Sequence, residues 1–178
     1  MKLRRKVSLV TGPGNPAPQP VKSLFRPAEG PIRLDIGQRY LGFDLGTKTI
    51  GLALSDAGHR IASPYQTLPR KKFTQDAAEL QKIVAKEGVG ALVLGLPVNM
   101  DGTEGPRCQA TRAFARNLSQ LIPLPVALWD ERLSTVAVQR MMTEEADLSR
   151  ARRAELVDKL AAGYILQSYL DWLAQQPG

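Results

Sequence analysis

Residues 40–56, YLGFDLGTKTIGLALSD, decide how this chain folds, because they place a carboxylate within an otherwise apolar strand. Residues 40–43 and 52–55 have the apolar pattern of two short buried strands, and the glycine-bounded segment between them favours a tight turn. Asp44 continues the first strand, where an uncompensated buried charge costs several kcal/mol. The stretch therefore predicts a hairpin with a cation beside Asp44. The alternative is an aspartate that caps the turn at Gly46.

The rest of the chain alternates between strand-like and helix-like patterns. The segment at 60–68 predicts a third strand, which Pro64 restricts to a sheet edge. The later predicted elements are a helix at 74–87 with Thr74 as N-cap, a strand at 91–96, a helix at 107–121, a strand at 125–129, a helix over 136–142 capped by Ser134 or Thr135, and a last helix at 154–173. A three-strand meander followed by helix, strand, helix, strand and helix predicts an α/β protein with a mixed sheet.

Composition narrows the class of protein and the kind of metal site. The 178 residues suffice for one domain with a tail, and no apolar run approaches the roughly 18–20 residues that span a bilayer. The single cysteine, Cys108, and the single histidine, His59, exclude a zinc cluster built from those residue types. Any metal would be held by oxygen atoms, which favours magnesium, manganese or calcium.

The positive charge is concentrated at the N-terminus. Of the net +7, most comes from the first 39 residues, which hold eight basic and two acidic side chains. Residues 1–38 also contain TGPGNPAPQP and no sustained apolar period, so we predict a Pro-rich, basic and disordered N-terminal extension before a domain at 39–178. The extension is either an electrostatic arm for phosphate backbones or a solvated leader, and the sequence leaves both open.

Three acidic residues stand out by their context. Asp44 lies on the first strand, Glu131 lies at the carboxyl end of the fifth, and Asp158 lies in the apolar last helix. Alanines one turn from Asp158 leave room for a metal or a phosphate to approach, although a surface aspartate is the alternative. Asp130 precedes Glu131 on the strand and should point to the opposite face, so only Glu131 is assigned to the site.

Four segments of the chain together resemble the YqgF/RuvX family, an RNase H-like group related to the RuvC Holliday-junction resolvases. They are GFDLGTKTIGLALSD, LVLGLPVNMDGTEG, DERLST and ARRAELVDKLAAGYILQSYL, within residues 40–171. The resemblance implies an RNase H-like α/β fold, with a five-stranded mixed sheet whose first three strands are antiparallel and which is flanked by helices. It also carries the family's acidic residues onto Asp44, Glu131 and Asp158.

The resemblance implies a cytoplasmic hydrolase, a divalent-metal-dependent nuclease that processes the 5′ end of precursor 16S rRNA. The alternative is a Holliday junction resolvase-like endonuclease that acts on branched DNA in recombination or repair. Phosphodiester hydrolysis suits two ions about 3.5–4 Å apart, so we predict two Mg²⁺ or Mn²⁺ ions. Asp44 would bridge them, while Glu131 and Asp158 would each hold one. The expected partner is RNA or branched DNA, with no membrane, and the protein is expected to be a monomer or a homodimer.

Six further residues are candidates for nucleic-acid binding: Lys48, Asn99, Arg132, Arg150, Arg152 and Arg153. Lys48 lies in the hairpin turn, where the alternative is a solvated lysine, and Arg132 would neutralise either the acidic cluster or the scissile phosphate. Asn99 lies in a loop expected to border the substrate. Contacts of this kind give affinity without sequence preference. The basic run at 70–72 is interpreted instead as a solvated loop.

Two other classes of protein compete with the nuclease. The DLGTK turn is similar to the phosphate-binding turn of sugar kinases and actin-like ATPases, but those need two such halves, and about 140 residues form only one. A non-catalytic nucleic-acid-binding module would tolerate loss of the carboxylates, and all three are present. Tyr164, Tyr169 and Trp172 recur at helical spacing and are interpreted as core or dimer contacts before stacking platforms.

Overall fold

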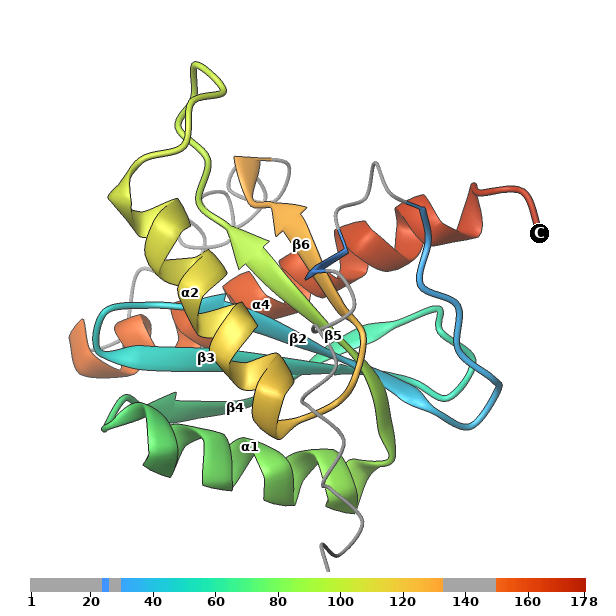
Figure 1. Cartoon of the computed structure of the whole chain (residues 1–178), viewed down its shortest axis with the longest axis horizontal. Coiled ribbons are helices and arrows are strands. Elements are labelled where there is room, and N and C mark those ends of the chain that lie inside the picture. Colours follow the sequence, from blue (N-terminus) through green and yellow to red (C-terminus); the bar gives the residue numbers. More distant parts are fainter. Residues whose placement is uncertain (1–23, 26–29, 133–149) are drawn as a thin grey trace, which may run out of the picture.

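Six strands form the sheet that organises the part of the chain described by the computed structural model, residues 24–25, 30–132 and 150–178 (Figure 1). The elements in chain order are β1 (Leu24–Phe25), β2 (Arg39–Leu45), β3 (Thr49–Ser55), β4 (Ala62–Pro69), α1 (Phe73–Glu87), β5 (Val89–Leu96), α2 (Pro106–Leu121), β6 (Val126–Asp130) and α4 (Arg150–Ala174).

The strands lie in the order β1-β6-β5-β2-β3-β4. The pairs β2–β3 and β3–β4 are antiparallel, whereas β2–β5, β5–β6 and β1–β6 are parallel. This arrangement confirms the five predicted strands, the antiparallel order of the first three and the edge position of β4. The sequence did not predict β1, because two residues are too few to show a period.

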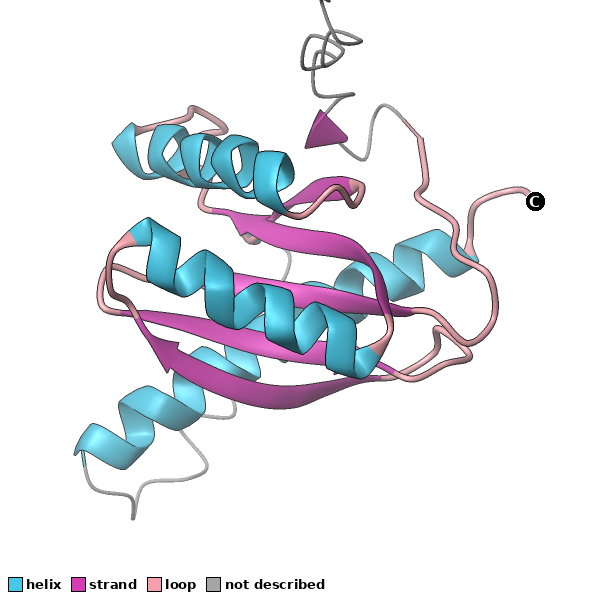
Figure 2. Cartoon of the chain, turned by 60° about the horizontal axis from the view of Figure 1, so that its bottom comes forward, coloured by secondary structure: helices cyan, strands magenta, loops and turns pink. Residues whose placement is uncertain are grey.

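The two faces of the sheet carry different helices. Figures 1 and 2 show α1 and α2 on one face and α4 on the other. Along β2, Leu41 and Phe43 belong to the core beneath α1 and α2, whereas Tyr40 packs with Tyr169 of α4. Because side chains alternate along a strand, Asp44 shares the α4 face with Tyr40.

The helices begin earlier than the sequence predicted. The prediction of Thr74 as N-cap is wrong, since α1 begins at Phe73 and Lys72 is the N-cap, without a side-chain hydrogen bond. The Oδ1 atom of Asp76 instead accepts a hydrogen bond from the N–H of Lys71 at 3.0 Å. The last helix begins at Arg150, because arginine and alanine are good helix formers even where they show no apolar period.

Residues 30–38, which the sequence analysis assigned to the extension, pack against α4. Ile32 is 7% exposed, its N–H donates to Tyr169 Oη at 3.2 Å, and its carbonyl accepts from Tyr40 Oη at 2.7 Å. Arg33 donates to the carbonyls of Gln176 and Pro177 near the other end of the chain. The rest of the predicted extension, apart from β1, and the predicted helix over 136–142 lie outside the described residues.

The last helix, α4, is 25 residues long and half covered by the sheet. Apolar and polar residues are interspersed along α4. The buried residues, such as Ala162, Leu166 and Leu170, face the sheet. Within the described ranges, neither α4 nor any other helix combines the length and apolarity needed to cross a bilayer.

Candidate active site

Asp44 lies one residue before the end of β2, on the face that α4 covers. Its partner across the antiparallel pair is Gly51 of β3, which has no side chain to fill the space beside it. The turn that follows is closed by the backbone, because the N–H of Gly46 donates to the carbonyl of Thr49 at 2.9 Å. The half-buried carboxylate of Asp44 therefore lies at the carboxyl end of a central strand, beside Gly51 of the neighbouring strand.

Glu131 follows β6 directly and reaches across the neighbouring strand. Its N–H donates to the carbonyl of Leu96 at 3.1 Å, which anchors the backbone to the end of β5. A Cβ atom added to Gly95 of β5 would lie 2.6 Å from Oε1 of Glu131, closer than real Cβ contacts. The carboxylate therefore occupies the space that this glycine leaves. Because β5 lies between β6 and β2, that position brings Glu131 towards Asp44.

The surroundings of Glu131 disfavour its negative charge. Burial, and then the charge of Asp44, raise the pKa of Glu131 to about 7. The positive charge of Arg107, in the first turn of α2, acts in the opposite direction and lowers that pKa. Two carboxylates that repel one another in a largely buried place are a common feature of metal and catalytic sites.

Asp130 has a different role from Glu131, as the strand alternation predicted. Its carboxylate binds the guanidinium of Arg132, with Nε to Oδ2 at 2.9 Å and Nη2 to Oδ2 at 2.6 Å. Burial raises the pKa of Asp130, but its hydrogen bonds with Arg132 outweigh burial and the net shift is downward. Arg132 therefore neutralises Asp130, and this pairing holds the guanidinium at the end of β6.

The path of α4 sets where Asp158 lies along the sheet. A Cβ atom added to Gly42 of β2 would lie 2.7 Å from Cβ of Leu166, so helix and strand are in close contact there. Further along α4, Tyr169 packs at the start of β2. The helix thus runs against the direction of β2, and the turns that precede Leu166, including Asp158, lie towards the end that carries Asp44. The side chain of Asp158 is outside the described part of the structure.

The chemistry of these donors suits a hard divalent cation. Asp44 and Glu131 offer only oxygen atoms, which magnesium and manganese prefer, and a cation between them would relieve the repulsion that raises the pKa of Glu131. Among the described side chains, no group of three acidic, histidine or cysteine residues comes together. A third ligand would have to come from a residue such as Asp158.

The structure describes four of the six predicted nucleic-acid-binding residues in detail. Lys48 is exposed in the turn between β2 and β3, and Arg152 is exposed in the first turn of α4. Asn99, in the loop after β5, donates from Nδ2 to Oγ1 of Thr103 at 3.0 Å, and Arg132 is held by Asp130. For Arg150 and Arg153 the side chains lie outside the described residues.

Arg70 is a residue near the site that the sequence analysis missed. Residues 70–72 do form an exposed loop, but the backbone N–H of Arg70 donates to the carbonyl of Lys48 at 2.8 Å and its Nη1 donates to the carbonyl of Gly46 at 2.9 Å. Its guanidinium also lies 5.7 Å from the ring centre of Phe114. Only the antiparallel pairing of β3 with β4 brings Arg70 to the turn beyond Asp44.

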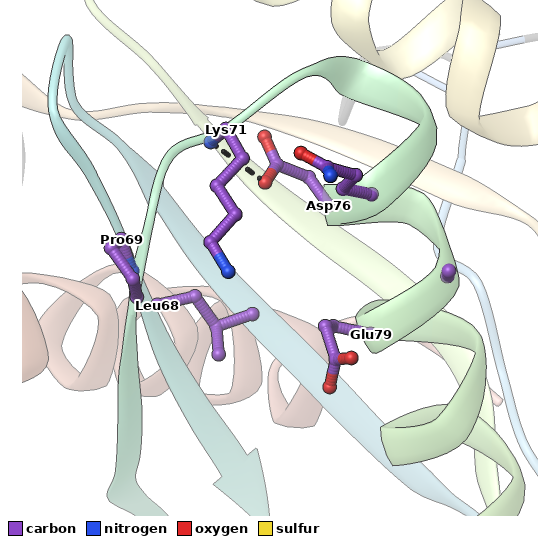
Figure 3. Close-up of a pocket in the computed structure, with 7 residues that line it drawn as sticks. Leu68, Pro69, Lys71, Asp76 and Glu79 are labelled. Carbon is purple, nitrogen blue, oxygen red and sulfur yellow. Dashed lines mark hydrogen bonds between the residues drawn. The ribbon is translucent and has the colours of Figure 1, made fainter.

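The neighbour of Arg70, Lys71, points away from that turn. Figure 3 shows its side chain over a pocket of about 420 Å³ between the end of β4 and the start of α1, near Asp76 and Glu79. Oδ2 of Asp76 is buried there without a hydrogen-bond partner. The basic run at 70–72 therefore divides, with Arg70 beside the candidate site and Lys71 beside α1.

Comparison with solved structures defines the class of the fold. The chain resembles RuvC of T. thermophilus, solved in complex with a Holliday junction substrate, with a TM-score of 0.51 and 13% identity over 78% of this chain and 97% of that one. It also resembles the Fowlpox virus resolvase, solved with Holliday junction DNA, with a TM-score of 0.50 and 10% identity over 78% of this chain and 100% of that one. This is the RNase H-like fold.

Sequence comparison then defines the family. A profile of the RuvX family, described as Holliday junction resolvase, matches residues 38–172. A protein of Paramagnetospirillum magneticum named "Putative pre-16S rRNA nuclease" is 62% identical over 148 residues, 83% of this chain and 95% of its own. A protein of the same name from Rhodobacter capsulatus is 65% identical over 133 residues, 75% of this chain and 83% of its own. The chain belongs to the RuvX family.

Proposed function

We propose that this protein is a divalent-metal-dependent nuclease that hydrolyses phosphodiester bonds. The observation that carries the proposal is that Glu131 lies over Gly95 and close enough to Asp44 for burial and the charge of Asp44 to raise the pKa of Glu131 to about 7. Such a pair is ready to accept a cation at the carboxyl end of the central strands. Membership of the RuvX family and the nuclease names of its relatives support the same activity.

The residues that would hold the metal are Asp44, Glu131 and Asp158, with two Mg²⁺ or Mn²⁺ ions as the best match to an all-oxygen donor set. When bound, such ions supply a water nucleophile and stabilise negative charge on the phosphate. The protein contributes the oxygen ligands and holds them in position. Lys48 and Arg132, on either side of the carboxylates, would neutralise the nucleic-acid backbone.

The proposed substrate is the 5′ end of precursor 16S rRNA in the cytoplasm, and the names of the relatives support precursor 16S rRNA as the class of substrate. The second candidate is branched DNA, which the description of the family and the fold of RuvC favour. A resolvase makes two symmetric cuts and would need a homodimer, whereas a processing nuclease can act as a monomer. Tyr169, one of the residues interpreted as a core or dimer contact, is buried in the protein's own core.

The experiment that tests the proposal compares cleavage of a labelled precursor-rRNA 5′ leader with cleavage of a four-way DNA junction. Each substrate is incubated with Mg²⁺, Mn²⁺ or EDTA and with wild type or Asp44→Asn. We expect metal-dependent RNA cleavage that falls at least about 100-fold in the variant, because loss of one group that stabilises transition-state charge costs about that much. Glu79→Gln, which changes an exposed carboxylate on α1, is the matched control and should cleave as wild type does.

The pattern of products separates the candidates. Paired nicks in the junction without RNA cleavage would make the protein a resolvase. Wild-type cleavage by Asp44→Asn would contradict the proposed site. Inactivity on both substrates with every metal would contradict the nuclease function and leave a nucleic-acid-binding module.

A further inference from the structure

A pocket of about 500 Å³ opens directly beside Glu131. Its walls come from the loop after β5, from the start of α2 and from the end of β6: Pro97, Val98, Asn99, Met100, Gly105, Pro106, Arg107, Glu131 and Arg132. The volume falls in the range of about 300–1,000 Å³ that is usual for sites that bind small molecules. Glu131 is the candidate metal-site carboxylate in these walls, and the other lining residues are available to the substrate.

The walls of the pocket combine positive charge with apolar surface. Arg132 is oriented by its bonds with Asp130, and Arg107 lies close enough to Glu131 to act on its charge. Both arginines can therefore meet a phosphate group near the carboxylates. On the loop, the side chain of Met100 is 84% exposed and adds apolar surface to the wall of the pocket.

This combination suits a nucleotide better than a continuous backbone. Guanidinium groups bind phosphates, and an apolar surface can pack against a base. A base inside a duplex is stacked and paired, and it enters a pocket only after both contacts are broken. An unpaired nucleotide enters without that loss. A pocket of this size beside the reacting groups therefore favours a substrate that is single-stranded at the cut.

We propose that this pocket holds the unpaired nucleotide next to the scissile phosphate, with Arg107 on its phosphate and Met100 against its base. The inference rests on the proposed nuclease function and adds a substrate class to it, a strand that is unpaired at the cut. Arg107 is a binding residue that the sequence analysis did not consider.

Binding in EDTA tests the pocket without any cleavage. The anisotropy of a fluorescent 12-nucleotide single-stranded RNA and of the same RNA in a blunt duplex is measured with wild type, Arg107→Gln and Arg116→Gln. Arg116 is an exposed arginine on the same helix, about 13 Å further along at 1.5 Å per residue. Thermal unfolding of each variant checks that it folds.

For Arg107→Gln we expect about tenfold weaker binding of the single strand, and a slope of log affinity against log salt that is smaller by about 1. Binding to the duplex should change little, Arg107→Lys should restore the salt slope, and Arg116→Gln should match wild type. Met100→Ala should weaken binding of the single strand and leave the salt slope unchanged.

Three results would overturn the inference. They are wild-type affinity and salt slope in Arg107→Gln, an equal loss on the duplex, and an equal loss in Arg116→Gln. These measurements are independent of catalysis, so a protein that binds RNA as expected but cleaves nothing would retain the pocket and contradict the nuclease proposal. A protein that cleaves RNA but binds the single strand equally well with and without Arg107 would retain the nuclease proposal and contradict the pocket.

Discussion

Ionisation of Glu131 destabilises the folded protein when no cation is bound. Its carboxyl group titrates at about 7 in the fold, against an ordinary value near 4.5, because it is buried and lies beside Asp44. The folded protein keeps this proton in a pH range where the unfolded chain has released it. By linkage, stability attributable to Glu131 is present below about pH 4.5 and is lost as the pH rises through about 7.

Glu131→Gln should remove this pH dependence, since the amide keeps the shape and carries no charge. In EDTA we expect the variant to match wild type in the free energy of unfolding at pH 4. At pH 8 it should be more stable by up to about 3 kcal/mol. Urea unfolding at several pH values measures the difference, and Glu79→Gln serves as the exposed control. A difference that does not vary with pH would contradict the raised pKa.

At pH 8, Mg²⁺ should make wild type more stable than Glu131→Gln, the opposite of the order expected in EDTA. A cation bound by the folded state raises its stability by RT ln(1 + [L]/Kd), and wild type offers it one more charged ligand. We therefore expect Mg²⁺ to raise the melting temperature of wild type more than that of Glu131→Gln. Equal increases would show that Glu131 does not contact the ion, and Na⁺ at matched ionic strength controls for screening.

Gly95 is the residue that makes room for Glu131, so Gly95→Ala should damage the site directly. The new methyl group would meet Oε1 of Glu131 and Cδ1 of Ile165, each at 2.6 Å. We expect a loss of stability of about 1–3 kcal/mol and a greater loss of metal-dependent cleavage. The matched control is Gly90→Ala on the same strand, where the methyl group meets only the flexible ends of Leu34 and Gln38. Equal activity in the two variants would contradict this account of the site.

At the scale of elements, the contact of α4 with β2 decides how close the last helix comes to the carboxylates. Gly42 has no side chain, and Cβ of Leu166 occupies the place where one would be. The turn of α4 that contains Asp158 is held at the same end of the sheet as Asp44 by this contact. A helix that moved outward would carry Asp158 away with it.

Gly42→Ala tests this contact, and Gly163→Ala, on the same helix but facing Pro64 of β4, is its comparison. In Gly42→Ala the methyl group would lie 2.7 Å from Cβ of Leu166 and 3.2 Å from the carbonyl of Ala162, so we expect a loss of about 2–3 kcal/mol of stability. In Gly163→Ala the methyl group meets Pro64 at an ordinary 3.6 Å. This variant should gain about 0.5–1 kcal/mol from helix propensity. Chemical unfolding measures both, and two effects of the same sign would be inconsistent with the packing.

At the scale of the whole molecule, residues 30–38 join the start of the sheet to the end of the last helix. Ile32 is buried between Tyr40 and Tyr169, and Arg33 holds the carbonyls of residues 176 and 177. We therefore propose that the folding unit does not begin at residue 39 but includes residues 30–38, in addition to the short strand β1 that pairs with β6. Without residues 30–38, the aromatic cluster of Tyr40, Tyr169 and Trp129 would become exposed to solvent.

Two truncations locate this boundary. Removal of residues 1–29 should leave a protein about 3 kcal/mol more stable than removal of residues 1–38, because burial of one isoleucine contributes about 1.5–3 kcal/mol and each lost hydrogen bond about 1 kcal/mol. Urea midpoints of the two proteins, with the full chain as reference, give the measurement. Equal midpoints would place the boundary at residue 39.

The alternation of residues along the chain was enough to predict the five main strands, the antiparallel meander and the α/β class. It was enough because each buried strand must hide one or two apolar faces, and that requirement is visible locally. Helix starts were predicted less well, since Phe73 begins α1 without a side-chain cap and Arg150 begins α4 before any apolar period. The role of residues 30–38 was missed because the apolar residues there, Ile32, Leu34 and Ile36, span too short a stretch to establish a period.

The sequence by itself determined which carboxylates to consider, since Asp44 and Glu131 are anomalous where strands should be apolar. Only the tertiary structure decided that Glu131 lies over Gly95 and near Asp44, that Arg70 reaches the turn beyond Asp44 and that Arg107 and Met100 line one pocket with Glu131. The physical reason is that the residues of the site are separated by long stretches of sequence. Periodicity reports the environment of each residue, whereas a site is formed by residues far apart in sequence, and their meeting depends on strand order and register.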